Sequence, residues 1–493
     1  MSNHSPAAPD PGRKVVMTVF IALVLDLLAF TMPLPLFPRL IAWYAQRESH
    51  APTTLLARLL GVFQSFRQSL LSISGSSVEL GHGQGQQGKN WDVVLLGGAM
   101  GSLFSFCQCI VSPWLGSLSD RHGRKKVLLA TMMGNLLSAA IWLRSTTFAS
   151  YLLSRLVGGL SEGNVQLSTA IISDVTTATT RSKSLALVGI AFSICFTLGP
   201  SLGAYFASRP IPLATAGNEA SWNVYALPAG ITLALLLVET LYLAGRLPET
   251  KDWRKSSPAE HNAGGSTDES VETVETIETV ESRLARLRAA GTLHGLFLLF
   301  FSGAEFTVSF LTWDLFGATN AQNGRLLSFI GILSALLQAR HVRPSLSRLG
   351  EIRLASYGVF SCILALTCLS TLPLTTIRSS PVLSTTVLYA AATCLAYTSA
   401  TVVTSLTAAA ASCCDEHGGR GHPALQRGRA LGGFRSRGQL GRAIGPILAS
   451  TMYWLLGPTA AYGIIATAMA GVWMLMGRSV REERDRRAKL KSK

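Results

Sequence analysis

The stretch GSLSDRHGRKK at residues 116–126 decides the fold of this 493-residue chain. Four of its positions are Arg or Lys, and it joins two long apolar stretches without room for a domain between them. Apolar segments of about 20 residues have the length that crosses a bilayer as a helix. Because short cationic loops stay on the cytosolic side of a membrane, this stretch predicts a cytosolic hairpin between two membrane helices.

The composition agrees with an integral membrane protein. Hydrophobic residues make up 48% and charged residues only 14%, the mean hydropathy is +0.35, and soluble domains carry about 25% charged residues. The net charge of +16 lies in short clusters between apolar runs, as positive-inside topology requires, so we expect no nucleic-acid partner. The sequence lacks a G-x-x-x-x-G-K-[ST] nucleotide motif. We expect no enzyme, no cofactor and no metal site.

Apolar runs predict twelve membrane helices, because only helices satisfy the backbone over spans of this length. Residues 53–74 are also apolar, but Arg and Gln interrupt them. They predict an amphipathic helix at the lumenal interface, since a thirteenth span would move the basic hairpin to the wrong side. The predicted spans are 15–40, 92–115, 126–145, 147–173, 184–207, 222–246, 291–316, 323–341, 352–373, 382–411, 430–456 and 459–478.

The expected fold is an all-α membrane protein with twelve helices in two pseudo-symmetric six-helix bundles. Both termini are predicted to be cytosolic, and no sorting signal distinguishes the plasma membrane from an endomembrane. The triplet repeat at 271–280 predicts either an amphipathic helix on the membrane surface or a disordered connector. The predicted domains are a tail at 1–14, a first bundle at 15–249 with a lumenal insertion at 41–90, a linker at 250–290, a second bundle at 291–478 and a basic tail at 479–493.

A Gly-Pro pair recurs half a chain apart. Gly199 and Pro200, followed by Gly203, lie in the fifth predicted span, and Gly445 and Pro446 lie in the eleventh. The recurrence at equivalent spans indicates a duplicated bundle with a site between the repeats. Proline removes a backbone donor and lets a helix bend. The pairs are either packing kinks or hinges of a rocking motion.

Several ionisable side chains interrupt the predicted spans. Each costs about 2.5–3.5 kcal/mol on insertion scales, so such groups face a cavity or a partner. One interpretation is structural ion pairing between helices, in which Arg155 satisfies Asp26 or Glu162, and the other is proton coupling and substrate binding. We place Glu239 at the membrane edge, and we expect Asp314 to cap the outer end of span seven. The candidate coupling and binding residues are Asp26, Arg155, Glu162, Glu305, Arg435 and Arg442, with His294 a weaker candidate near the cytosolic end.

The hairpin itself allows two interpretations. It is either a topology anchor or a gate. In the gate, Asp120 accepts from the N-terminus of a neighbouring helix, where anions are favoured, and Arg124 pairs with an acid across the loop. The gating residues are then Gly116, Asp120, Arg121, Gly123 and Arg124.

These motifs resemble those of the major facilitator superfamily. Residues 116–126 follow its loop pattern G-x-L-[AS]-D-R-x-G-R-[RK], and RLVGG at 155–159 resembles the fourth-helix motif, whose arginine is associated with proton transfer. GPSLG at 199–203 resembles the fifth-helix motif of antiporters, although Cys195 and Ala204 replace expected glycines. LPET at 247–250 resembles the ending of span six. The corresponding loop motif of the second half, at 338–341, lacks its Asp, so a gate rests mainly on the first half.

Within the superfamily, Asp26 followed by Pro33 is similar to the first helix of tetracycline/proton antiporters. The resemblance implies alternating access, with spans one, four, seven and ten lining the path. Tyr397 and Thr398 are then the candidate contacts of span ten. We expect a monomeric secondary transporter that couples protons to the export or exchange of small organic anions or drugs. The alternatives are an uncoupled facilitator and a non-transporting scaffold or sensor.

Overall fold

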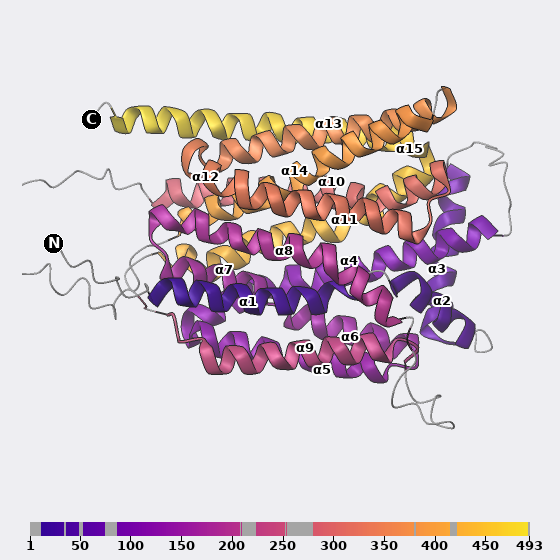
Figure 1. Ribbon diagram of the computed structural model, residues 1–493, viewed down its shortest axis with the longest axis horizontal. Helices are drawn as coiled ribbons and strands as arrows, with labels where there is room; N and C mark the ends of the chain where they lie inside the picture. The colour runs from indigo at the N-terminus through magenta and orange to yellow at the C-terminus, as the bar shows by residue number, and fades with distance from the viewer. Residues whose placement is uncertain are drawn as a thin grey trace, which may run out of the picture.

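The computed structural model describes residues 11–33, 36–48, 53–73, 86–207, 209, 223–251, 253, 280–378, 381–414 and 422–491. Within these ranges every regular element is helical (Figure 1). The helices are α1 (Pro11–Thr31), α2 (Phe37–Arg47), α3 (Leu55–Ile73), α4 (Gln86–His122), α5 (Arg124–Arg144), α6 (Phe148–Ser161), α7 (Asn164–Val175), α8 (Ala178–Ala207), α9 (Ala226–Arg246), α10 (Val280–Phe316), α11 (Asn320–Leu337), the π-helix η5 (Gln338–Val342), α12 (Arg343–Leu349), α13 (Glu351–Arg378), α14 (Pro381–Ser412), the 3-10 helix η6 (Pro423–Leu425) and α15 (Arg427–Lys491).

These elements form twelve membrane-crossing segments within the described ranges. Eight helices meet the length and hydropathy of a span. One of them, α15, contains two spans, because Gly457 has φ 80° and breaks the helix before Pro458. The remaining three are α4, the pair α6–α7 and α11, which run alongside the others (Figure 1). The prediction of a twelve-helix all-α membrane fold is confirmed.

The two halves pack as separate bundles. In the first, α1 packs on α8 and α9, and α5 packs on α6 and α9. In the second, α10 and α13 pack on α15, and α13 packs on α14. The halves meet along two lines, α4 against α15 and α8 against α11. We call the end that contains the turn at Gly123 the hairpin end and the opposite end, where α2 and α3 lie, the far end (Figure 1).

The fourth span differs from the prediction, which was one helix over 147–173. The structure ends α6 at Ser161 and starts α7 at Asn164. Between them Glu162 has ψ 94°, an extended conformation, and Gly163 precedes the new helix. Glycine stabilises a helix interior poorly, and the Glu162 side chain turns inward instead of continuing the apolar face. Broken spans of this kind surround binding sites in transporters.

The far-end insertion forms two helices. The described helix α3 agrees closely with the predicted helix at 53–74, whereas α2 falls partly in what was predicted as the end of span one. Tyr44 of α2 is fully buried, and its hydroxyl lies 3.0 Å from the Ser145 carbonyl oxygen and accepts from Asn223 Nδ2 at 2.7 Å. Burial raises the pKa of Tyr44 above its ordinary value. The insertion thus caps the far end of the first bundle.

Two helices extend beyond the predicted spans at the hairpin end. Helix α10 begins at Val280, eleven residues before the predicted start at 291, so the end of the linker is helical. Helix α15 continues past the predicted end at 478 to Lys491 (Figure 1). The triplet repeat lies, except for Val280, outside the described residues.

Candidate functional site

The hairpin carboxylate Asp120 binds the start of α15, a helix of the other half. Asp120 Oδ1 accepts from Gly428 N at 2.9 Å, and Oδ2 accepts from Arg429 N at 2.7 Å. The first backbone N–H groups of a helix lack intrahelical partners and carry the positive end of its dipole. The carboxylate satisfies two of them. Geometry of this kind matches the gate interpretation and links the two halves.

Arg124 ties the hairpin to the broken fourth span. Its Nη1 lies 2.7 Å from Asp120 Oδ1, and its Nε donates to Asp174 Oδ2 at 2.9 Å. Asp174 Oδ1 in turn accepts from Arg427 Nη1 at 2.9 Å. Arg124 is buried, and the carboxylates of Asp174 and Asp120 compensate its charge. Asp174 joins α5, α7 and α15 but was not recognised from the sequence, because no motif marks it.

Glu249 holds the turn between α4 and α5. Its Oε1 accepts from Arg124 N at 2.7 Å and caps α5 from the segment that follows α9. Gly123 has φ 102°, where side chains are strained, and a Cβ there would overlap the Glu249 carboxylate. Lys251 Nζ donates to the Arg121 carbonyl oxygen at 2.7 Å, and the Arg121 side chain is exposed. The sequence marked Glu249 only as part of a span ending.

Small residues let α4 and α15 touch along the hairpin half of the molecule. A Cβ on Gly116 would overlap the Gly428 carbonyl oxygen. Ser436 Oγ donates to the Cys109 carbonyl oxygen at 2.6 Å. Close backbone approach through small residues is a common way for membrane helices to pack. We call this contact the first seam; it comprises Cys109, Ser112 and Gly116 of α4 and Gly428, Gly432 and Ser436 of α15.

The second contact between the halves repeats this pattern. Ser193 Oγ of α8 lies 3.1 Å from Ser334 Oγ of α11. Gly189 faces Gln338 and Thr404, and Gly331 faces Thr197. This second seam comprises Gly189, Ser193 and Thr197 of α8 and Gly331, Ser334 and Gln338 of the second half. Together the two seams close the hairpin half of the interface.

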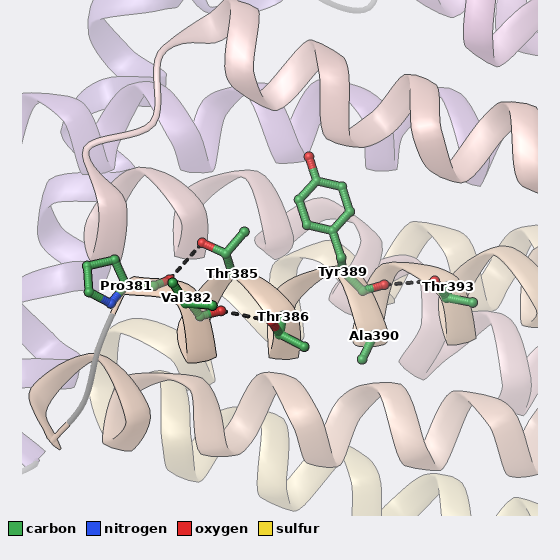
Figure 2. A pocket seen from close by; sticks show the side chains of 7 residues that line it. All are labelled: Pro381, Val382, Thr385, Thr386, Tyr389, Ala390 and Thr393. Carbon is green, nitrogen blue, oxygen red and sulfur yellow. Dashed lines mark hydrogen bonds between the residues drawn. The ribbon is translucent and has the colours of Figure 1, made fainter.

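Helix α14 contacts the second seam through Thr404, and toward the far end the same face of the helix is uncovered. Thr404, packed at the second seam, is 6% exposed, and Thr386 lies on its face five turns away. Around Thr386 lies a shallow hollow that is open to the surface, and every residue that lines it belongs to α14. Its threonine hydroxyls donate to carbonyl oxygens of their own helix at 2.8 Å, and the Tyr389 ring projects from the helix (Figure 2). The wall therefore offers methyl groups and an aromatic ring; it is lined by Pro381, Val382, Thr385, Thr386, Tyr389, Ala390 and Thr393.

The two candidates of span ten lie differently. The Tyr397 hydroxyl is 3.3 Å from His341 Nε2, on the π-helix that replaces the second-half loop motif. Thr398 is fully buried and donates to the Gly358 carbonyl oxygen of α13 at 3.0 Å. Thr398 joins α13 and α14, two helices of the same bundle. It does not face the interface between halves in this conformation, because it lies about 100° around the helix axis from Tyr397.

Arg155 does not pair with Asp26 or Glu162 in this structure. Its guanidinium carbon lies 5.8 Å from the centre of the Phe104 ring and 5.5 Å from that of Tyr151. Its Nε is buried and has no hydrogen-bond partner among the described residues. Stacking on aromatic faces holds an arginine without neutralising it, so no carboxylate of the described residues compensates the positive charge of Arg155.

Asp26 and Glu162 are buried inside the first bundle. Asp26 Oδ1 accepts from Asn164 Nδ2 at 2.7 Å, and Glu162 Oε2 accepts from Asn135 Nδ2 at 3.3 Å. Asn164 is the first residue after the break in the fourth span, so the break presents it to α1. The cation that acts on both carboxyls is Arg435 of α15. The charges thus lie on the two sides of the interface between halves, with no direct ion pair between them among the described residues.

A second, more open pair lies in the other bundle. Glu305 Oε2 is 4.0 Å from Arg442 Nη2, and the two side chains are 46% and 34% exposed. Arg442 Nε is buried and has no partner among the described residues. His294 stacks on Phe434 with ring centres 4.4 Å apart and lies against Gly438. Asp314, expected as a helix cap, instead accepts from the Tyr453 hydroxyl at 2.6 Å.

The Gly-Pro pairs occupy equivalent contacts. A Cβ on Gly199 would overlap Thr31 of α1, and one on Gly203 would overlap the Met32 carbonyl oxygen. A Cβ on Gly445 would overlap the Leu299 carbonyl oxygen of α10. Pro200 and Pro446 lie inside continuous helices. Close packing on the first helix of each bundle accounts for the glycines, and the hinge role stays a prediction.

Known proteins resemble this chain along most of its length. A family model described as Major Facilitator Superfamily matches residues 19–422. Major facilitator superfamily domain-containing protein 10 from Homo sapiens is 34% identical over 480 residues, which cover 94% of this chain and 92% of that protein. Tetracycline resistance protein, class B, from Escherichia coli is 27% identical over 163 residues, covering 33% of this chain and 37% of that protein.

A solved structure agrees with the fold. The crystal structure of the human organic anion transporter MFSD10 (TETRAN) superposes with a TM-score of 0.73 at 31% identity, covering 94% of this chain and 99% of that one. The two-bundle architecture, the loop pattern at the hairpin and the full-length matches agree with one another. The chain belongs to the Major Facilitator Superfamily of membrane transporters.

Proposed function

We propose that this protein is a proton-coupled transporter that exports or exchanges small organic anions by alternating access. The observation that carries the proposal is Arg155, a cation held by two aromatic rings with a buried Nε that has no partner among the described residues. An organic anion with an aromatic body supplies both the missing acceptor and a ring to stack. The human relative described as an organic anion transporter supports this substrate class.

We assign proton coupling to charged residues that lie on the two sides of the interface between halves. Arg435 belongs to the second half, whereas Asp26 and Glu162 belong to the first. Ionised carboxyls attract Arg435 and hold the halves together, and protonated ones release it. Proton binding thereby changes both the closure of the interface and the number of free cations facing the substrate. Glu305 and Arg442 extend the same path, since both are partly exposed.

Closure is assigned to the hairpin. We propose that the hairpin end faces the cytosol, because the short connections there are basic. Asp120, Arg124 and Asp174 then close the cytosolic side together with the two seams, and the open hollow on α14 lies toward the outside. This arrangement is one end state of alternating access. The protein acts as a monomer in the bilayer in this proposal, with the membrane itself unassigned.

The test uses purified full-length protein in proteoliposomes. The probe is a fluorescent aryl sulfonate, whose charge stays constant between pH 5 and 8, and the membrane potential is clamped at zero with potassium and valinomycin. We expect a pH gradient to drive accumulation of the probe above equilibration, and Asp26→Asn to lower this accumulation. Flux that only equilibrates the probe indicates an uncoupled facilitator. No flux of any organic anion indicates a scaffold or sensor.

A further inference from the structure

Glu239 lies where the sequence did not place it. The prediction put it at the membrane edge, but it is 1% exposed in the core of the first bundle. The error has a simple cause: α9 carries leucine and other apolar residues on its exposed as well as its buried face, so the sequence marks the buried face only weakly. An acid among leucines on such a helix can point either way.

The packing of α9 on α1 brings Glu239 to the level of Asp26. Thr232 Oγ1 lies 3.5 Å from the Ala29 carbonyl oxygen, and the two helices run in opposite directions. Glu239 follows Thr232 by two turns toward the hairpin end, and Asp26 precedes Ala29 by nearly one. At a rise of 1.5 Å per residue the two acids are offset by only about 6 Å along the helix axes.

The charges around Glu239 are of its own sign. The helices packed on α9 are α1, α5 and α8. Among the described residues the charged groups that act on Glu239 are Asp26 of α1 and Glu162 at the end of α6. The Oε2 atom of Glu239 has no hydrogen-bond partner among the residues that the structure describes. Arg435, which acts on the other two acids, is not among the charges that act on Glu239.

An ionised carboxylate does not fit this environment. A buried charge needs a counter-charge and hydrogen bonds, and without them its burial costs several kcal/mol. Two neighbouring carboxyls make the cost higher, because like charges oppose one another's ionisation. Glu239 therefore carries a proton in this conformation. The carboxyls Asp26, Glu162 and Glu239 can together hold more than one proton, because Arg435 acts on only two of them.

We propose that Glu239 is a second proton-carrying residue of the transport cycle, with Asp26 and Glu162 as the first site. This inference rests on the proton coupling proposed above. Glu239 takes up a proton from water on one side of the membrane as a carboxyl O–H. It gives the proton back to water on the other side, forming a carboxylate and a hydronium ion, when the bundle is hydrated in the opposite state.

The experiment compares proton coupling in Glu239→Gln and wild-type proteoliposomes. Glutamine keeps the shape and neutrality of the protonated acid but cannot release a proton. With the potential clamped at zero, each proton carried per anion adds a factor of about ten to the limiting accumulation ratio for each pH unit of gradient. We expect the Glu239→Gln ratio of the aryl sulfonate to be tenfold lower per pH unit than the wild-type ratio.

Controls separate this inference from the proposed function. Glu281→Gln alters an exposed acid in the first turn of α10 and should keep the wild-type ratio. Size-exclusion elution and equilibration of the probe without a gradient verify that Glu239→Gln folds. If Glu239→Gln misfolds, Glu239→Asp replaces it in the test; aspartic acid keeps a proton, so this variant should give the wild-type accumulation ratio. A wild-type ratio in Glu239→Gln overturns the role of Glu239 alone. Wild-type protein that ignores the gradient overturns both proposals.

Discussion

Replacing Asp120 by Asn should open the hairpin end. The carboxylate makes two charge-assisted hydrogen bonds, to Gly428 N and Arg429 N, and an ion pair with Arg124 at 2.7 Å. Its side chain is 6% exposed, so solvent screens these contacts weakly. Hydrogen bonds to charged groups contribute about 1.5–3 kcal/mol each. Asparagine keeps one neutral acceptor, so we expect a net loss of about 3 kcal/mol from the closed conformation.

A native cysteine reports this opening. Cys414 follows α14, is 1% exposed, and senses the charges of Arg427 and Asp120. Burial raises the pKa of its thiol to about 12, which keeps it protonated and unreactive while the hairpin end is closed. A loss of 3 kcal/mol lowers the ratio of closed to open protein about 100-fold. The rate of Cys414 alkylation in Asp120→Asn, followed by peptide mass spectrometry, should rise by a similar factor.

The control is Arg121→Gln, which removes an exposed hairpin cation whose backbone, rather than side chain, makes the observed contact. It should leave the alkylation rate within a factor of two of wild type. If Asp120→Asn also stays within that factor, Asp120 does not hold the halves together, and the hairpin is only a topology anchor.

Three further changes probe the seam, the anion site and the far-end cap. Ser436→Cys should form a disulfide with native Cys109, because the present Oγ and Sγ lie 3.5 Å apart; oxidation should stop sulfonate flux and reduction restore it, and unimpeded flux in the crosslinked protein would show that this seam need not open. Arg155→Gln should raise the KM for the aryl sulfonate about 10–100-fold, the loss of one charged contact, whereas a KM unchanged from wild type removes Arg155 from the binding site. Tyr44→Phe removes one of the acceptors of Asn223 Nδ2 and the hydroxyl that donates to the Ser145 carbonyl oxygen, and it should lower thermal stability by about 1–2 kcal/mol, with flux at low temperature retained; an unchanged melting temperature contradicts the buried network.

The sequence predicted the architecture because the signals are local. Apolar runs of membrane length and cationic loops are read directly, and the turn at Gly123 follows a loop pattern with a positive-φ glycine. Asp120 was expected to accept from a neighbouring helix N-terminus, and it does so at α15. The gating role of that contact stays a prediction until the alkylation experiment is done.

The sequence could not predict which side chains meet across helices. Neither Asp174 nor Asn164 was assigned a role from the sequence, and they become important only because α7 starts anew beside α1 and α5. Arg155 was weighed as a partner for Asp26, but the aromatic rings of Phe104 and Tyr151 hold it elsewhere. Contacts of this kind depend on how each helix is oriented about its own axis. In a membrane helix that is apolar on most sides, the spacing of apolar residues does not predict this orientation.

The two halves close the hairpin end by different chemistry. The first half has a charged turn, in which Glu249 caps α5 and Arg124 is bound by two carboxylates. The corresponding turn of the second half keeps a positive-φ glycine, Gly350, but replaces the acidic loop motif with a π-helix. From this part of the second half, Gln338 of the π-helix packs against Gly189, and Glu351 at the start of α13 accepts from Ser182 Oγ of α8 at 2.9 Å. Salt screens charged contacts more than neutral ones, and the network around Asp174 is nearly buried. Closure should therefore depend weakly on ionic strength but strongly on each of the carboxylates Asp120 and Asp174.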